Sequence, residues 1–136
     1  KRWTTSVCDP DKHASFIKKQ EIPLKTNFYK PCLFNHKFNL VSVIYVLEHV
    51  ANPIRILRHA KKDMGKNSFL YIEVPDAVAF QRKPKNDDIF NSTHLWMFDK
   101  QTLANLLDQC GFKIIRAKKL QTIRDNFALM ALAIKK

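Results

Sequence analysis

The chain has 136 residues, a length that suits one domain with a single hydrophobic core. Apolar residues make up 46% of it and charged residues 26%, a balance that is typical of globular proteins and too apolar for a disordered chain. The apolar runs are too short to span a bilayer, so no membrane partner is expected. The sequence begins at Lys1 without a methionine, which suggests a longer precursor or an edited form.

The formal net charge of +12 is concentrated at the two ends of the chain. Residues 1–37 carry eight basic and three acidic side chains, and residues 113–136 carry seven and one. The middle of the chain is close to neutral. Basic ends favour an acidic partner, such as a phosphate-bearing substrate or a nucleic acid. A solvated basic surface without a specific partner explains the same pattern, and both interpretations remain open.

The cysteines are few and widely spaced. Cys8, Cys32 and Cys110 form an odd set without the close, paired spacing of a disulfide framework or a zinc knuckle. We therefore expect reduced cysteines in a cytoplasmic protein, and no metal-binding set is predicted.

The first part of the chain predicts two short strands. Residues 3–8 are rich in β-branched and aromatic types and stop at the turn-forming stretch 9–11. A short helix is expected over 12–20, followed by a strand around 24–29.

The stretch FNLVSVIYVLEHVANP is the most apolar part of the sequence. Residues 38–47 are apolar at nearly every position, the pattern of a strand that is buried on both faces. Asn52-Pro53 predicts the start of a helix, because the Asn side chain can cap it and Pro needs no donor at the first position. Gly65 is expected to end this helix in a left-handed conformation.

The second half predicts a strand over 68–75 and a long loop over 76–98, of the length often found in lids and binding loops. Asp99 is expected to cap a helix over 100–110 that ends at Gly111.

Two strands are predicted at the end of the chain, over 112–119 and 126–135. Alternation of helices with doubly buried strands indicates an α/β fold, an open Rossmann-like sheet with helices on both faces. The last two strands form an antiparallel pair at its end.

Five stretches in this order resemble a class I S-adenosylmethionine-dependent methyltransferase: VCDPD, FNLVSVIYVLEHVANP, FLYIEVPDA, HLWMF and DKQTLANLLDQCGF. They span nearly the whole chain as one domain, residues 1–136. The resemblance implies S-adenosyl-L-methionine as the cofactor and methyl transfer to an unidentified acceptor.

The resemblance also implies cofactor-binding positions. Asp9 matches the acidic residue that accepts from the ribose hydroxyls, although Asp-Pro is also a common turn former. Asn27 lies near the position that faces the adenine. Tyr45 and Val46 would line the floor beneath the methionine part.

The residues that follow would lie at the carboxyl edge of the sheet. His49 would face the site, and Glu48 would either anchor the following helix or take part in the chemistry. His94 and Trp96 match the loop that builds an acceptor pocket in this family. Trp96 would either stack on a planar substrate or close the core. No catalytic residue is assigned, because methyl transfer from a sulfonium depends mainly on positioning.

One feature of the family is missing. Its first strand ends in a glycine-rich turn, whereas this chain has two glycines, Gly65 and Gly111, and both are predicted to end helices. The missing strand should precede Lys1, so we expect an N-terminally truncated domain with weak or absent cofactor binding.

In the family sheet the missing strand is central, between 3–8 and 38–47. Its absence would expose two apolar strand edges. We expect these strands to pair with each other, to be covered by another chain or by self-association, or to be hidden by disorder.

Two other functions remain open. The first is a catalytically inactive methyltransferase-like module that binds a partner, and the second is a nucleic-acid-binding domain, for which the charge is the only indication. The fold does not identify the acceptor.

Overall fold

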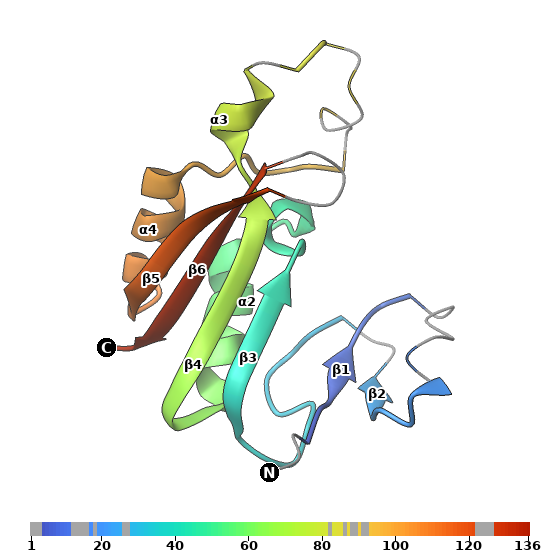
Figure 1. Ribbon diagram of the computed structural model, residues 1–136. Coiled ribbons are helices and arrows are strands. Elements are labelled where there is room, and N and C mark those ends of the chain that lie inside the picture. Colours follow the sequence, from blue (N-terminus) through green and yellow to red (C-terminus); the bar gives the residue numbers. More distant parts are fainter. Residues whose placement is uncertain are drawn as a thin grey trace.

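The computed structural model describes residues 4–11, 17, 19–25, 28–81, 83–85, 87, 90, 93–121 and 127–136. Its main feature is a four-stranded sheet in the order β3-β4-β6-β5 (Figure 1). The strands are β3 (Phe38–Ile44), β4 (Met64–Pro75), β5 (Phe112–Gln121) and β6 (Phe127–Lys135). Two long helices lie behind the sheet in this view, α2 (Pro53–Asp63) and α4 (Lys100–Gln109).

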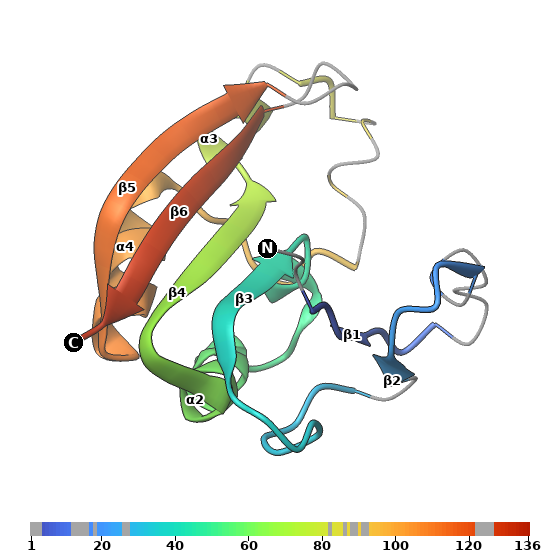
Figure 2. The same ribbon diagram turned by 60° about the horizontal axis from the view of Figure 1, so that its bottom comes forward.

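The pairing of the strands confirms the predicted Rossmann-like open sheet. β3 and β4 are parallel, with Val41 opposite Leu70, and α2 forms the crossover between them. β4 and β5 both pair antiparallel with β6, which lies between them (Figure 2). The predicted antiparallel pair at the end of the chain is therefore confirmed. The parallel pairing brings the carboxyl ends of β3 and β4 to the same edge of the sheet.

The core lies on one face of the sheet. It includes Leu57, Leu70, Ile72, Leu103, Leu107 and Ala131, which come from both long helices and from two central strands. On the opposite face, Phe69 is 41% and Ile115 is 48% exposed. Helices were expected on both faces, but both long helices of the described residues cover the same one.

The predicted double burial of the 38–47 strand is wrong. Of the seven residues in β3, Val43 alone is buried, whereas Leu40 is 42% and Ile44 is 46% exposed. The cause is structural, since β4 is the one strand paired with β3 in the described part of the chain. No long helix of that part covers the face that carries Leu40 and Ile44.

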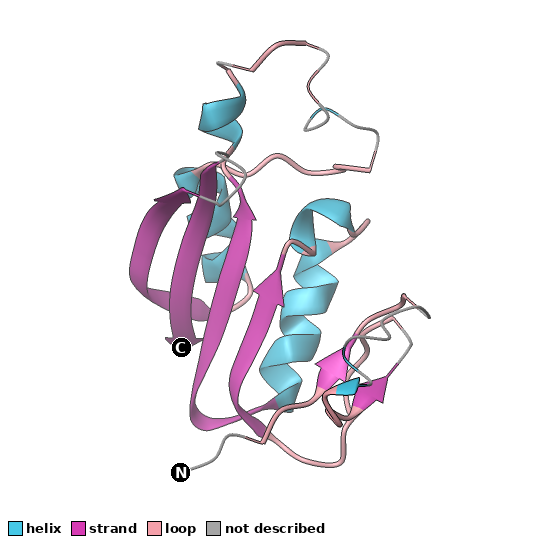
Figure 3. Cartoon of the chain, turned by 45° about the vertical axis from the view of Figure 1, so that its right-hand side comes forward, coloured by secondary structure: helices cyan, strands magenta, loops and turns pink. Residues whose placement is uncertain are grey.

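The first strands form a separate two-stranded sheet beside the main one (Figure 3). β1 (Val7–Cys8) and β2 (Leu24–Lys25) are parallel, and both are shorter than predicted. In the described part of the chain β1 and β3 belong to different sheets, so the expectation that these two strands pair directly is wrong. Most of the predicted helix over 12–20 lies outside the described residues.

The helix caps follow the sequence signals with one exception. The Asn52 side chain accepts a hydrogen bond from the Arg55 backbone N–H at 2.9 Å, and Pro53 is the first helical residue, as predicted. Asp99 and Thr102 form a reciprocal capping box at the start of α4. Gly111 follows α4 with a left-handed φ of 75°.

The exception is Gly65, which was predicted to end α2. The helix ends at Asp63, Met64 is extended, and Gly65 belongs to β4. The left-handed residue in this region is Asn67, with a φ of 56°.

Two short elements lie at the carboxyl edge of the sheet. The 3-10 helix η1 (Leu47–His49) follows β3, and α3 (Ala77–Phe80) follows β4. Within the described ranges, no helix has the length and apolarity needed to cross a membrane.

Removal of the α2 cap should weaken the fold. Asn52→Ala leaves an orphan backbone N–H at the start of α2, so we expect the free energy of unfolding to fall by about 1 kcal/mol. Denaturation in urea measures this loss. Asn35→Ala, at an exposed loop position, is the matched control and should change stability by less than about 0.5 kcal/mol. Equal losses in the two variants would contradict the capping role.

The one-sided core predicts different costs for the same substitution on the two faces. Ile72→Ala removes a fully buried side chain and should cost about 2–5 kcal/mol of unfolding free energy. Ile115→Ala, on the exposed face, should cost at most about 1 kcal/mol. If both variants lose the same amount in urea denaturation, the face that carries Ile115 is covered in solution and the one-sided core is wrong.

Candidate functional site

The chain leaves β3 through a strained residue. Tyr45 adopts a left-handed φ of 51°, and its backbone N–H donates to the Glu73 carbonyl at 3.0 Å. For a residue with a side chain this conformation costs about 1–2 kcal/mol, and such strain clusters at functional sites. Tyr45 and Val46 are each 39% exposed. The carboxyl edge of β3 therefore presents an apolar surface on a backbone fixed by β4.

The η1 helix ties this edge to the long loop that follows α3. Leu47 is fully buried in the core and holds η1 in place. The Glu48 carbonyl accepts hydrogen bonds from the backbone N–H groups of Leu95 and Trp96, at 2.7 and 3.2 Å. Residues 93–98, predicted as part of the acceptor loop, thus lie against the end of β3.

Glu48 is a buried carboxylate without a hydrogen bond. Its residue is 1% exposed, and neither side-chain oxygen has a hydrogen-bond partner. The Nε2 atom of His49 lies 3.8 Å from Oε1. Burial raises the pKa of this carboxyl, whereas its own backbone N–H and then the charges of His49 and His94 act in the opposite direction. The side chain that caps α2 is Asn52, and Glu48 makes no side-chain hydrogen bond to that helix.

The two histidines of the predicted site lie side by side. The ring centroids of His49 and His94 are 4.8 Å apart. The Nδ1 atom of His49 is 2.9 Å from the Thr93 carbonyl, which can only accept, so Nδ1 donates the hydrogen bond. This contact leaves Nε2 as the nitrogen that faces Glu48. The structure therefore joins residues that are far apart in the sequence.

Trp96 is held across the same edge. Its indole N–H donates to the Val50 carbonyl at 2.8 Å, and the residue is 44% exposed. That exposure excludes the interpretation in which Trp96 closes the core. The ring can stack on a ligand, as the alternative interpretation requires.

The end of β4 adds two groups that face the same side. Tyr71 donates a hydrogen bond from its hydroxyl to the Glu73 carboxylate. Burial, helped by Glu73, raises the pKa of Tyr71 to about 12. Burial also raises the pKa of Tyr45, and the negative charges of Glu73 and Glu48 raise it further. Tyr71 was missed from the sequence, although its spacing of two from Glu73 places both on one face of the strand.

Asp76, just after β4, has a structural role. It is 3% exposed, pairs with the Lys119 ammonium at 2.7 Å and caps α3 by accepting from the Val78 N–H. Its charge is satisfied within the fold, so it is not a candidate for chemistry.

Asp9 is not placed in the main sheet. Its side chain accepts from the Asp11 N–H at 2.8 Å, which is a turn contact, and its own N–H donates to the Lys25 carbonyl. No strand pairing of the described residues joins β1 to β3, so Asp9 does not lie next to Tyr45 in a sheet. Asn27 lies outside the described residues.

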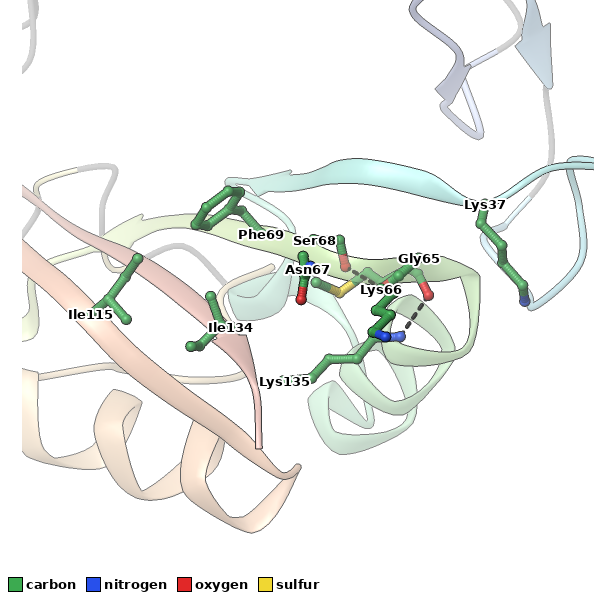
Figure 4. Close-up of a pocket in the computed structure, with 10 residues that line it drawn as sticks. Lys37, Gly65, Lys66, Asn67, Ser68, Phe69, Ile115, Ile134 and Lys135 are labelled. Atoms are coloured by element: carbon green, nitrogen blue, oxygen red, sulfur yellow. Dashed lines mark hydrogen bonds between the residues drawn. The ribbon is translucent and has the colours of Figure 1, made fainter.

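An open hollow of about 800 Å³ lies at the opposite end of β4 (Figure 4). Its lining includes Lys37, Lys66, Phe69, Ile115 and Lys135. This hollow lies at the amino ends of β3 and β4. Ligands of open α/β sheets bind at the carboxyl ends of the strands. The hollow also has a left-handed residue, Asn67, but asparagine adopts this conformation at lower cost than tyrosine. The carboxyl edge holds the left-handed Tyr45 and the Glu48 carboxylate that lacks a hydrogen bond, so it is the candidate site.

Residues 1–117 match the family model described as a methyltransferase domain. No curated protein matches the sequence significantly. The fold is similar to a methyltransferase from Thermotoga maritima described as a possible histamine N-methyltransferase, with 16% identity, 96% of this chain and 73% of that chain covered, and a TM-score of 0.72. A methyltransferase from Methanosarcina mazei has 17% identity and a TM-score of 0.69, and the match covers 94% of this chain and 80% of that chain. The glycopeptide N-methyltransferase MtfA, complexed with S-adenosyl-L-methionine, has 9% identity and a TM-score of 0.73, and the match covers 98% of this chain and 73% of that chain.

Identities this low show a shared fold, whereas the family match spans most of the sequence. The open sheet, the crossover through α2 and the position of the candidate site at the carboxyl edge agree with that match. The chain belongs to the methyltransferase domain family.

Proposed function

We propose that this domain transfers a methyl group from S-adenosyl-L-methionine to a small acceptor at the carboxyl edge of β3 and β4. The observation that carries the proposal is the left-handed turn at Tyr45, which presents Tyr45 and Val46 to solvent directly after β3. Membership of the methyltransferase family supports the reaction type. The similar glycopeptide N-methyltransferase, solved with this cofactor, supports the choice of methyl donor.

The residues at the edge fit such a cofactor in part. Tyr45 and Val46 would lie beneath the methionine chain, and His49 would face it from η1. The Oδ1 atom of Asp9 accepts a hydrogen bond from the Asp11 N–H, and the other carboxylate oxygen would accept from the ribose hydroxyls. Asn27 is proposed to face the adenine. The bound cofactor supplies an electrophilic methyl group, and the protein positions the acceptor in line with it and excludes water.

The acceptor would lie against the loop that carries His94 and Trp96. Because the Val50 carbonyl holds the indole N–H, the ring of Trp96 is oriented before a ligand arrives. An aromatic face held in this way favours a planar acceptor. The net charge of +12 favours an acidic or phosphate-bearing molecule over a cationic one.

The cysteines support a cytoplasmic location. None of Cys8, Cys32 and Cys110 forms a disulfide bond. Burial raises the pKa of Cys110, which keeps its thiol protonated and unreactive. Free thiols are usual in the reducing cytoplasm, where we place this activity.

Binding of the cofactor by these 136 residues should be weak. Close approach of a backbone to the methionine end of the ligand needs glycine, which has no Cβ. The chain has no Gly-x-Gly, Gly65 lies at the amino end of β4, and Gly111 follows α4. Neither glycine lies at the carboxyl edge.

Titration of the ¹⁵N-labelled chain with S-adenosylhomocysteine, the product of the cofactor, tests this placement. We expect weak, saturable shifts of the amide signals of residues 45–49 and 94–96. Val46→Asp puts a charge on the proposed floor and should abolish these shifts. Val78→Asp, at a similarly exposed valine in α3, is the control and should retain them.

Two outcomes would contradict the proposal. Shifts confined to the hollow around Lys37 and Phe69 would move the site to the other end of the sheet. A complete absence of shifts at millimolar ligand would favour the catalytically inactive, partner-binding module. Tight binding would support the site but refute the argument from the missing glycine turn.

A further inference from the structure

We propose that Glu48, His49 and His94 bind a divalent transition-metal ion such as Zn²⁺. One potential ligand atom from each of the three residues lies within 4.8 Å of those of the other two. The sequence predicted no metal site, because cysteine spacing was its one indicator. The structure shows a carboxylate and two imidazoles that come together from η1 and from the loop before α4.

The state of Glu48 is the strongest argument for an ion. The fold satisfies its other buried carboxylates: Asp63 accepts from the Tyr29 hydroxyl at 2.8 Å and from the Cys32 N–H at 2.9 Å. Asp76 has its ion pair with Lys119. Both side-chain oxygens of Glu48 lack a hydrogen bond at 1% exposure. A buried carboxylate of this kind is strongly destabilising unless a cation or a proton neutralises it.

The geometry of His49 suits a metal ligand. Its Nδ1–H donates to the Thr93 carbonyl, which fixes both the tautomer and the orientation of the ring. Histidines that bind metals are typically oriented by such a contact to their other nitrogen. The Nε2 atom then lies 3.8 Å from Glu48 Oε1, too far for a hydrogen bond. Two ligands that are each about 2.1 Å from one tetrahedral ion are about 3.4 Å apart, so only a small closure is needed.

The third ligand, His94, is held close by the backbone. The two residues that follow it, Leu95 and Trp96, both donate to the Glu48 carbonyl. His94 is therefore held near Glu48 by the backbone hydrogen bonds of the two residues that follow it. Its ring lies 4.8 Å from that of His49, centroid to centroid.

The donor set indicates the kind of ion. Two imidazoles and one carboxylate suit Zn²⁺ and other first-row transition metals, whereas Ca²⁺ and Mg²⁺ prefer oxygen ligands alone. Three protein ligands leave at least one position for water or for an oxygen atom of a small molecule. The His49 side chain is 39% exposed, so this position is accessible from solvent. That it would hold the methyl acceptor rests on the proposed function, but the binding of the ion does not.

Calorimetric titration with Zn²⁺ tests the site in a Cys8→Ser/Cys32→Ser background, which removes the two cysteines that are not buried. We expect one ion per chain and much weaker binding of Mg²⁺. His49→Ala and His94→Ala should each weaken Zn²⁺ binding at least about tenfold, since loss of even an orienting partner costs 10–100-fold. His36→Ala, at an exposed histidine that packs on Phe34 and Phe38, should leave the affinity unchanged.

Glu48→Gln separates metal binding from folding. It preserves the shape of the side chain and removes its charge, so the metal-free variant should melt at the same temperature as the wild type or higher. Zn²⁺ should raise the melting temperature of the wild type and not that of Glu48→Gln. No cofactor is present in these measurements, so their outcome is independent of the proposed methyl transfer.

Three results would overturn the proposal. The first is the absence of stoichiometric Zn²⁺ binding. The second is a Zn²⁺ affinity that is the same in all three ligand variants as in the His36→Ala control. The last is a melting temperature of metal-free Glu48→Gln below that of the metal-free wild type. The last would show that an ion pair with the histidines, and not a metal, balances the Glu48 charge.

Discussion

The position of β4 between a parallel and an antiparallel neighbour is the constraint on which the rest of the structure depends. Its alternation places Leu70, Ile72 and Val74 in the core and leaves Phe69 and Tyr71 on the opposite face. A slip of one residue in its register would exchange the two sets, exposing the core and burying polar groups. The parallel bonds to β3 also bring the ends of both strands together. The candidate site and the core are therefore fixed by the same hydrogen bonds.

The sequence predicted those elements whose signals are local. Asn52 and Asp99 cap the helices that follow them, and Gly111 ends α4 in a left-handed conformation. These roles depend on neighbouring residues in the sequence, and they are confirmed. The end of α2 could not be predicted in this way. Asp63, its last residue, is held by Tyr29 and Cys32, which lie about thirty residues earlier in the chain. The burial of β3 was overestimated for a similar reason, because an apolar strand is buried only where another layer covers it.

The sequence predicted the site residues that directly follow a strand. It missed the properties of the site that depend on contacts between distant parts of the chain. Tyr45, Val46 and His49 lie at the expected edge, because a parallel sheet gathers the residues that follow its strands. Sequence alone cannot show that Glu48 lacks hydrogen-bond partners, since that property depends on everything around it. Asp9 was expected at the same edge, but its strand pairs with β2 in a sheet of its own.

The two outer strands of the main sheet differ in charge. β5 carries exposed cations at Lys113, Arg116 and Lys118, whereas β3 exposes Leu40, Ser42 and Ile44. Lysine and arginine on a border strand repel the approach of a further strand from another molecule. A strand arriving at β5 would have to bring acidic side chains, and its attachment would weaken as ionic strength rises. β3 has no such electrostatic barrier, so the molecule is protected against sheet extension on one flank only.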